Sequence, residues 1–150
     1  MTPTRKTVIE IDPRSTHNGF ERSQFFIPGQ MPGLNELINT ARGTKGMASI
    51  AAAAGQKRKW TERAALYIRD AMIRLDIKTY TNPVFVDLVW LEQNRRRDPD
   101  NIVSAKKFVF DGMVLAGMLP NDGWKNIKGF SDTWRVDKGC QGVWVTVWGC

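Results

Sequence analysis

The strongest constraint on the fold is a strand-like run, Val84-Phe85-Val86-Asp87-Leu88-Val89-Trp90-Leu91, that is apolar on nearly both faces. A strand with apolar side chains on both faces is shielded from water only when other layers of the protein cover both faces. The run therefore predicts a central strand of a sheet. The Asn82-Pro83 pair breaks the chain just before it. The chain must therefore build a layered domain in which neighbouring strands and helices surround this segment.

Flanking segments supply those neighbours. Apolar residues recur at spacings of three and four from Gln56 to Leu75, which predicts a helix with a charged outer face. Further helices are predicted over Leu34–Ala41 and Asn101–Leu119, and the chain from Ala41 to Gly55 is expected to be a mobile loop. Strands are expected at Thr7–Ile11, Phe25–Ile27, Val84–Leu91, Ile127–Phe130 and Val143–Trp148. Because there is no internal repeat or linker, residues 1–150 are predicted to form one α+β domain, a mixed β-sheet packed against helices.

Composition excludes several classes of protein. The chain is 42% hydrophobic and has no apolar run of about 20 residues and no apolar leader, so no membrane association and a cytoplasmic location are expected. Cys140 and Cys150 are too few for a zinc site and are expected to be reduced thiols. The only histidine, His17, lies in a turn-rich stretch, which removes most histidine-dependent catalysis.

The positive charge is unevenly distributed. The net charge is +7, and residues 42–74 hold eight Lys or Arg against only Glu62 and Asp70. Basic residues bind a polyanion without base specificity because they release counterions condensed on its phosphates. A basic chain can also simply be more soluble, so charge alone does not establish nucleic-acid binding.

The most informative motif is Arg95-Arg96-Arg97-Asp98-Pro99-Asp100-Asn101, where the buried strand ends and a helix is predicted to begin. Pro99 keeps Asp98 extended, so that the carboxylates of Asp98 and Asp100 can point the same way. Two nearby carboxylates repel unless a cation lies between them, and Mg²⁺ is the oxygen-ligand metal this sequence suits. The alternative is a turn followed by a helix cap, but three adjacent arginines favour a phosphodiester site.

Helical spacing adds further candidates. At 100° per residue, Asp100, Ser104, Lys107 and Asp111 share one face of the predicted helix, so Lys107 can look toward the same site as Asp100. The alternative is an ordinary ion pair between Lys107 and Asp111. Asp122, within Pro120-Asn121-Asp122-Gly123-Trp124, either belongs only to a turn or returns to the side of this helix.

Together these segments resemble the RusA family of Holliday-junction resolvases, in the version found in phages and prophages. The resemblance spans about residues 23–130 and rests on Arg97-Asp98-Pro99-Asp100-Asn101, on Asn121-Asp122-Gly123-Trp124-Lys125, and on Phe26-Ile27-Pro28-Gly29-Gln30-Met31-Pro32-Gly33-Leu34-Asn35 upstream.

The resemblance implies a homodimeric, Mg²⁺-dependent endonuclease of a bacterial or phage-infected cell, which cuts four-way DNA junctions in recombination and repair. Asp98, Asp100 and Asp122 would be the metal ligands. The family's catalytic lysine follows the second aspartate by four positions, where this chain has Ser104. Lys107 is the expected replacement and Lys106 the weaker one.

The predicted site therefore has metal ligands, a lysine at the phosphate, and basic or polar contacts to flanking DNA. The expected DNA contacts are Arg95, Arg96, Arg97, Lys57, Arg58, Lys59 and Asn101. Two alternatives remain at this stage: a non-catalytic DNA-binding module, and a structural or protein-interaction domain that uses the six tryptophans.

Overall fold

The structure is a computed structural model that describes residues 22–43 and 47–149. The predicted strand Thr7–Ile11, His17 and Cys150 lie outside these residues. The described part contains, in chain order, β1 (Arg22–Pro28), α1 (Leu34–Gly43), α2 (Met47–Arg74), β2 (Val84–Glu92), α3 (Pro99–Val103), α4 (Lys106–Leu115), β3 (Ile127–Val136) and β4 (Gly142–Gly149).

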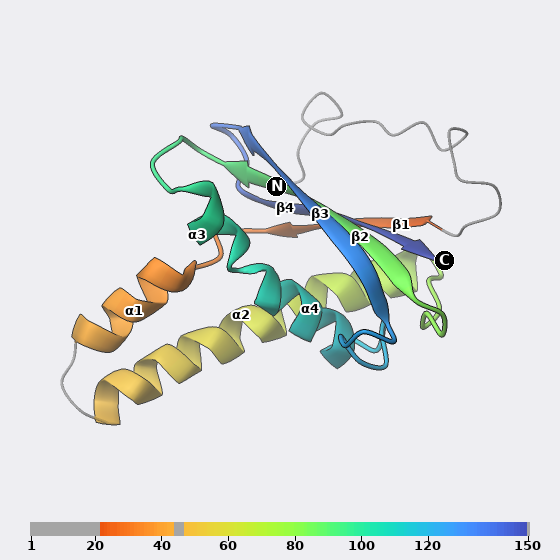
Figure 1. Cartoon of the computed structure of the whole chain (residues 1–150), viewed down its shortest axis with the longest axis horizontal. Helices are drawn as coiled ribbons and strands as arrows, with labels where there is room; N and C mark the ends of the chain where they lie inside the picture. The colour runs from red at the N-terminus through yellow and green to blue at the C-terminus, as the bar shows by residue number, and fades with distance from the viewer. Residues whose placement is uncertain (1–21, 44–46, 150) are drawn as a thin grey trace.

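The four strands form one mixed sheet in the order β1-β4-β2-β3 (Figure 1). The apolar run of Val84–Leu91 lies in β2, which has a neighbour on each side, so the predicted central position is confirmed. It pairs antiparallel with β4 and parallel with β3, and α3 and α4 make the crossover that a parallel pair needs. The predicted α+β architecture with a mixed sheet is therefore correct.

Helices α2 and α4 pack against one face of the sheet, and the core lies between these helices and the sheet (Figure 1). Side chains that alternate along β2 and β4 point into it, and Val86 is opposite Val147. Ile68 of α2 and Val109 of α4 meet them, all fully buried. The same alternation turns Asp87, the polar residue of the apolar run, to the other face of the sheet.

Asp87 is compensated on that face. Its carboxylate accepts hydrogen bonds from the Ser131 hydroxyl at 2.5 Å and from the Trp148 indole at 2.7 Å. A polar residue in a central strand therefore costs little here, because both carboxylate oxygens have donors.

Two helix predictions are wrong. The expected loop before Gly55 is helical from Met47, because the alanines at 51–54 have the highest helix propensity and extend α2 through Gly55. The single helix expected over Asn101–Leu119 is two helices, with a break at residues 104–105 and an end at Leu115. Within the described residues, no helix is both long and apolar enough to span a membrane.

Close contact between α2 and α4 depends on Gly112. A Cβ at this position would lie 2.8 Å from Ala64 Cβ and 3.1 Å from Ala65 N. We expect Gly112→Ala to force the helices apart and lower the free energy of unfolding by about 2 kcal/mol, measured by urea denaturation. As the matched control, Gly55→Ala meets nothing closer than 4.0 Å and should stabilise by up to about 1 kcal/mol. Equal effects of the two substitutions would contradict this account.

Candidate functional site

The predicted motif lies where β2 ends, and Arg97 holds this end in place. Its guanidinium forms ion pairs with Glu92 at 2.7 Å and Glu36 at 2.5 Å, and it donates a hydrogen bond to the Met31 carbonyl at 3.0 Å. Only 16% of the Arg97 side chain is exposed. Burial is the largest single influence on the pKa of Arg97 and lowers it, but the hydrogen bonds to Glu92 and Glu36 and the charges of these two carboxylates together raise it by more, so this cation stays charged.

Asn101 joins α3 to the start of α1. Its amide nitrogen donates to Glu36 Oε2 at 2.7 Å, and its Oδ1 accepts from the Asn35 backbone N–H at 3.0 Å. Gly33 is required beside it, because a Cβ there would lie 2.2 Å from the Asn101 carbonyl oxygen. The Pro28–Asn35 segment and the Arg97–Asn101 segment, separate in the sequence, are thus packed together. The sequence predicts DNA contacts for Arg97 and Asn101; in the structure their polar groups bind protein.

Ser104 takes part in the same junction. Its hydroxyl accepts a hydrogen bond from the Leu34 N–H at 2.8 Å and donates one to the Asn101 carbonyl at 2.6 Å. The first of these satisfies a backbone donor at the N-terminus of α1 that has no partner within the helix. The position where the resemblance leads one to expect a lysine therefore holds a residue that joins two helices.

Asp98 and Asp100 lie on the outer side of this junction. Asp98 is extended at φ −70° and ψ 149°, Pro99 begins α3, and Asp100 follows in the first turn, as predicted. Both carboxylates are exposed. Asp98 makes no capping hydrogen bond within the described part of the chain, whereas Asp100 accepts only from the adjacent Asn101 N–H at 3.0 Å. Capping therefore does not account for Asp98.

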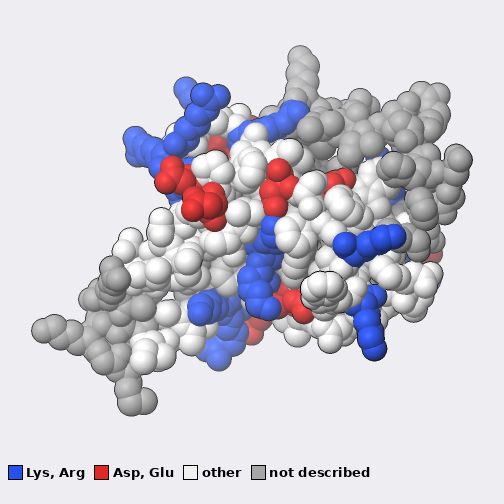
Figure 2. Space-filling model, in the orientation of Figure 1, with Lys and Arg blue, Asp and Glu red and all other residues white. Residues whose placement is uncertain are grey.

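Two exposed cations precede these carboxylates in the chain. Arg95 and Arg96 are exposed, and across residues 22–43 and 47–149 neither side chain has a hydrogen bond or ion pair. Figure 2 shows basic atoms directly beside acidic atoms over the α3 region. The Lys57-Arg58-Lys59 cluster lies on α2, is likewise exposed, and has no ion pair to any described residue.

Lys107 and Asp122 form a separate group. Lys107 Nζ lies 3.0 Å from Asp111 Oδ1 and 3.6 Å from Asp122 Oδ2, so the turn does bring Asp122 back beside α4. The hydrogen bond to Asp111 is the largest influence on Lys107 and raises its pKa. Lys106 instead binds Asp132 of β3 at 2.5 Å. The ion pair observed between Lys107 and Asp111 is the alternative to the predicted role of Lys107, and the Asp122 contact joins it.

The structure does not gather the predicted ligands into one cluster. In the described residues, no group of three or more His, Cys, Asp or Glu side chains lies close enough to hold a metal ion. Asp98 and Asp100, two positions apart at the start of α3, are called the acidic pair below, and Asp122 belongs to the Lys107 group. Mg²⁺ is commonly held by one or two carboxylates together with waters and substrate phosphate, and the exposed Asp98–Asp100 pair fits that donor set.

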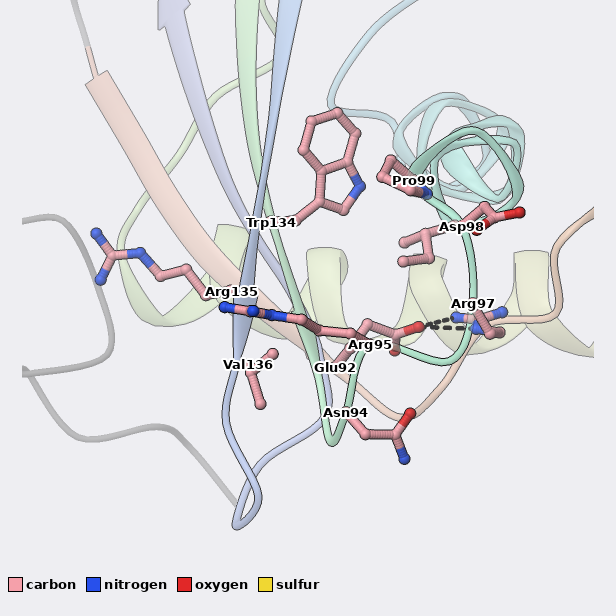
Figure 3. A pocket seen from close by; sticks show the side chains of 10 residues that line it. Glu92, Asn94, Arg95, Arg97, Asp98, Pro99, Trp134, Arg135 and Val136 are labelled. Carbon is pink, nitrogen blue, oxygen red and sulfur yellow. Dashed lines mark hydrogen bonds and ion pairs between the residues drawn. The ribbon is translucent and has the colours of Figure 1, made fainter.

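Two clefts meet at Asp98. The Trp134 cleft, of 670 Å³, is lined in part by Asn94, Arg95, Asp98, Pro99, Trp134 and Val136 (Figure 3). The Trp60 cleft, of 530 Å³, is lined in part by Gln30, Asn35, Gln56, Trp60, Arg96 and Asp98. Asp98 is therefore common to both clefts.

Sequence reasoning missed Trp60 and Trp134 as site residues. Trp60 falls at an apolar position of the helix predicted over Gln56–Leu75, where a core position is the ordinary interpretation. Trp134 was missed because the expected strand ended at Phe130, whereas β3 continues to Val136. The alternation of Phe130, Asp132 and Trp134, which share one face of the strand, is the signal that extends it.

The environment of the Glu36 carboxylate predicts how the stability of the fold depends on pH. Burial is the largest single influence on the pKa of Glu36 and raises it, but the hydrogen bonds from Arg97, Asn101 and the backbone, together with the Arg97 charge, lower it by more in sum, so it lies below the ordinary 4.5. A depressed carboxyl pKa stabilises the fold above pH 4.5, and this stabilisation is lost as pH falls through the folded-state pKa. Glu36→Gln should cost about 1 kcal/mol at pH 7 and flatten the loss of stability on acidification, measured by urea denaturation between pH 7 and pH 3.

The matched control is Glu62→Gln, which changes an exposed glutamate of α2 and should leave the pH dependence unchanged. If the Glu36 variant lost stability with acid as steeply as the parent chain, the role given to the Arg97 network would be wrong.

The chain matches no family model and no curated protein.

Proposed function

We propose that this chain is a Mg²⁺-dependent endodeoxyribonuclease that cuts branched DNA, four-way junctions in particular. The observation that carries the proposal is the exposed Asp98–Asp100 pair, of which Asp98 lines both clefts, one together with Arg95 and the other together with Arg96. Neither carboxylate is neutralised by an ion pair to the described residues. Two adjacent anions left without a cation repel each other, so a site of this kind favours a divalent ion.

Each part of the site has a defined role in phosphodiester hydrolysis. Asp98 and Asp100 would hold Mg²⁺, which when bound supplies charge stabilisation at the phosphate and lowers the pKa of coordinated water. Arg95 and Arg96 would bind phosphate oxygens of the same strand, because guanidinium groups match phosphate geometry. Asp122 and Lys107 stay in the proposal as third ligand and phosphate contact.

Affinity for the rest of the DNA would come from cations outside the acidic pair. Lys57, Arg58 and Lys59 are exposed on α2, and both neighbours of this cluster in sequence, Gln56 and Trp60, line the Trp60 cleft. Phosphate contacts of this kind position a duplex arm without reading its sequence. A junction requires two symmetric cuts, so a homodimer with two identical sites matches the substrate.

A non-catalytic DNA-binding module is the second candidate, because the described residues form no cluster of three carboxylates. The basic residues alone would suffice for binding, and the acidic pair would then have no catalytic task. Cleavage and binding must therefore be measured separately.

Replacing Asp100 distinguishes the two candidates. Asp100→Asn keeps the side-chain shape and removes one metal-binding charge, so we expect cleavage of a synthetic four-way junction in Mg²⁺ to fall at least about 100-fold. Binding of the same junction in EDTA should be unchanged or tighter, because an anion near the phosphates is lost. Both are measured by gel electrophoresis of labelled junctions, with linear duplex as a further substrate.

Asp70→Asn is the control, since it removes one negative charge from an exposed site on α2 where Arg74 is the partner. It should cleave at the parent rate. The endonuclease proposal fails if the Asp100 variant cleaves as fast as this control, or if the parent chain shows no Mg²⁺-dependent cleavage.

A second comparison tests Asp122. Asp111 and Asp122 both contact Lys107, so they form a matched pair. If Asp122 is a metal ligand, Asp122→Asn should reduce cleavage about as strongly as Asp100→Asn, and Asp111→Asn should leave most activity. Equal, small effects of the two variants would mean that Asp122 only positions Lys107, which would remove it from the ligand set. Single-turnover cleavage rates provide the readout.

A further inference from the structure

Trp134 is a partly exposed aromatic residue at the end of β3 that is nearest the acidic pair. It is opposite Trp90 in the parallel register, so both point to the helical side of the sheet. Trp90 is buried there, and its indole donates to Asp132 at 2.9 Å. β3 is an edge strand, and the Trp134 side chain keeps 43% of its surface exposed. An indole exposed to this extent in a cleft is available to a ligand.

The Trp134 cleft has a mixed character. Pro99, Ile102 and Val136 provide apolar walls near the indole, and Figure 3 shows Trp134 and Pro99 on facing sides of the space. Arg95 contributes a cation with no partner among the described residues. Its volume of 670 Å³ falls within the range of about 300–1,000 Å³ typical of small-ligand sites. Flat, apolar and cationic surfaces together are complementary to a nucleotide.

We propose that this cleft binds an unpaired nucleobase of the DNA substrate, stacked on Trp134, with its phosphate toward Arg95. The inference rests on the proposed function and adds how the branch is recognised. Every base has a π-face, so stacking on an indole is tolerant of sequence but requires a base that has left the duplex stack. Branch points and single strands offer such bases, whereas continuous duplex does not.

The position of Asp98 connects this cleft to the proposed chemistry. Asp98 lines the Trp134 cleft, and its carboxylate points away from the indole (Figure 3). It also lines the Trp60 cleft. A strand whose base occupies the Trp134 cleft therefore carries its adjacent phosphodiester past Asp98. Base capture would thus select the bond at the branch.

Two substitutions at one position isolate stacking from packing. Trp134→Leu keeps an apolar side chain without a π-face, and Trp134→Phe keeps a smaller ring. The probes are a four-way junction with 2-aminopurine at the branch point, a single-stranded oligonucleotide and a blunt duplex, all in EDTA so that no cleavage occurs. We expect the leucine variant to bind junction and single strand about 10-fold more weakly and the duplex unchanged, with the phenylalanine variant within about threefold of the parent. Binding should quench 2-aminopurine fluorescence in the parent and phenylalanine chains, but not in the leucine chain.

Phe130→Leu is the matched control, because Phe130 lies on the same strand and face, is also exposed, and contacts Phe110 and Lys106 outside the cleft. It should bind and quench as the parent does. Urea denaturation establishes that each variant is folded at the temperature of the assay. Equal binding and quenching by the leucine and phenylalanine variants would overturn the proposal that the Trp134 cleft binds a base.

This outcome is distinct from failure of the endonuclease proposal. If the parent chain cleaves junctions in Mg²⁺ while Trp134→Leu binds and quenches normally, the cleft assignment is wrong and the endonuclease proposal stands. If no cleavage occurs but the leucine and phenylalanine variants differ as expected, the base-binding cleft stands on a protein that is not a nuclease.

Discussion

The rest of the site depends on one buried cation, the guanidinium of Arg97. It binds Glu92 at the end of β2 and Glu36 in the first turn of α1, which come from distant parts of the chain. Removing a partner from such a buried set leaves an uncompensated charge, at a cost of about 3–5 kcal/mol where burial is complete. Because Asn101 binds Glu36 as well, the same network fixes the start of α3. The position of the acidic pair is therefore a consequence of this ion-pair network.

Neighbouring residues of one motif have opposite environments. Arg97 is turned inward and neutralised, whereas Arg95 and Arg96 face solvent without ion pairs to any described residue. Asp98 and Asp100 are exposed next to them. Charges of the same sign that lie close together repel each other unless a ligand of opposite charge compensates them. The exposed aspartates of the motif are therefore suited to bind a cation, and its exposed arginines are suited to bind a phosphate. Composition alone cannot make this distinction among three consecutive arginines.

The sequence predicts the architecture well because the relevant signals are local. The apolar run in β2 must be central, and Pro99 must begin a helix at Asp98–Asp100; both are observed. The break at residues 104–105 coincides with a contact between residues 70 positions apart, the hydrogen bond from the Leu34 N–H to Ser104, which local periodicity does not predict. The inward turn of Arg97 was missed for the same reason. Helical periodicity carries no information on contact partners that are distant in the sequence. These partners decide which side chains of the motif are bound within the protein and which are exposed to a ligand.

The strength of the Asp122 ion pair bears on the proposal that Asp122 is a third metal ligand. Lys107 is 69% exposed, and an exposed pair contributes about 0–1 kcal/mol. Lys107 also holds Asp111 at 3.0 Å, closer than Asp122 at 3.6 Å, so it keeps a carboxylate partner if Asp122 is withdrawn. In the proposed function, a divalent cation bound at Asp98 and Asp100 would compete for Asp122 against this weak contact only, so releasing the third carboxylate from Lys107 would cost little.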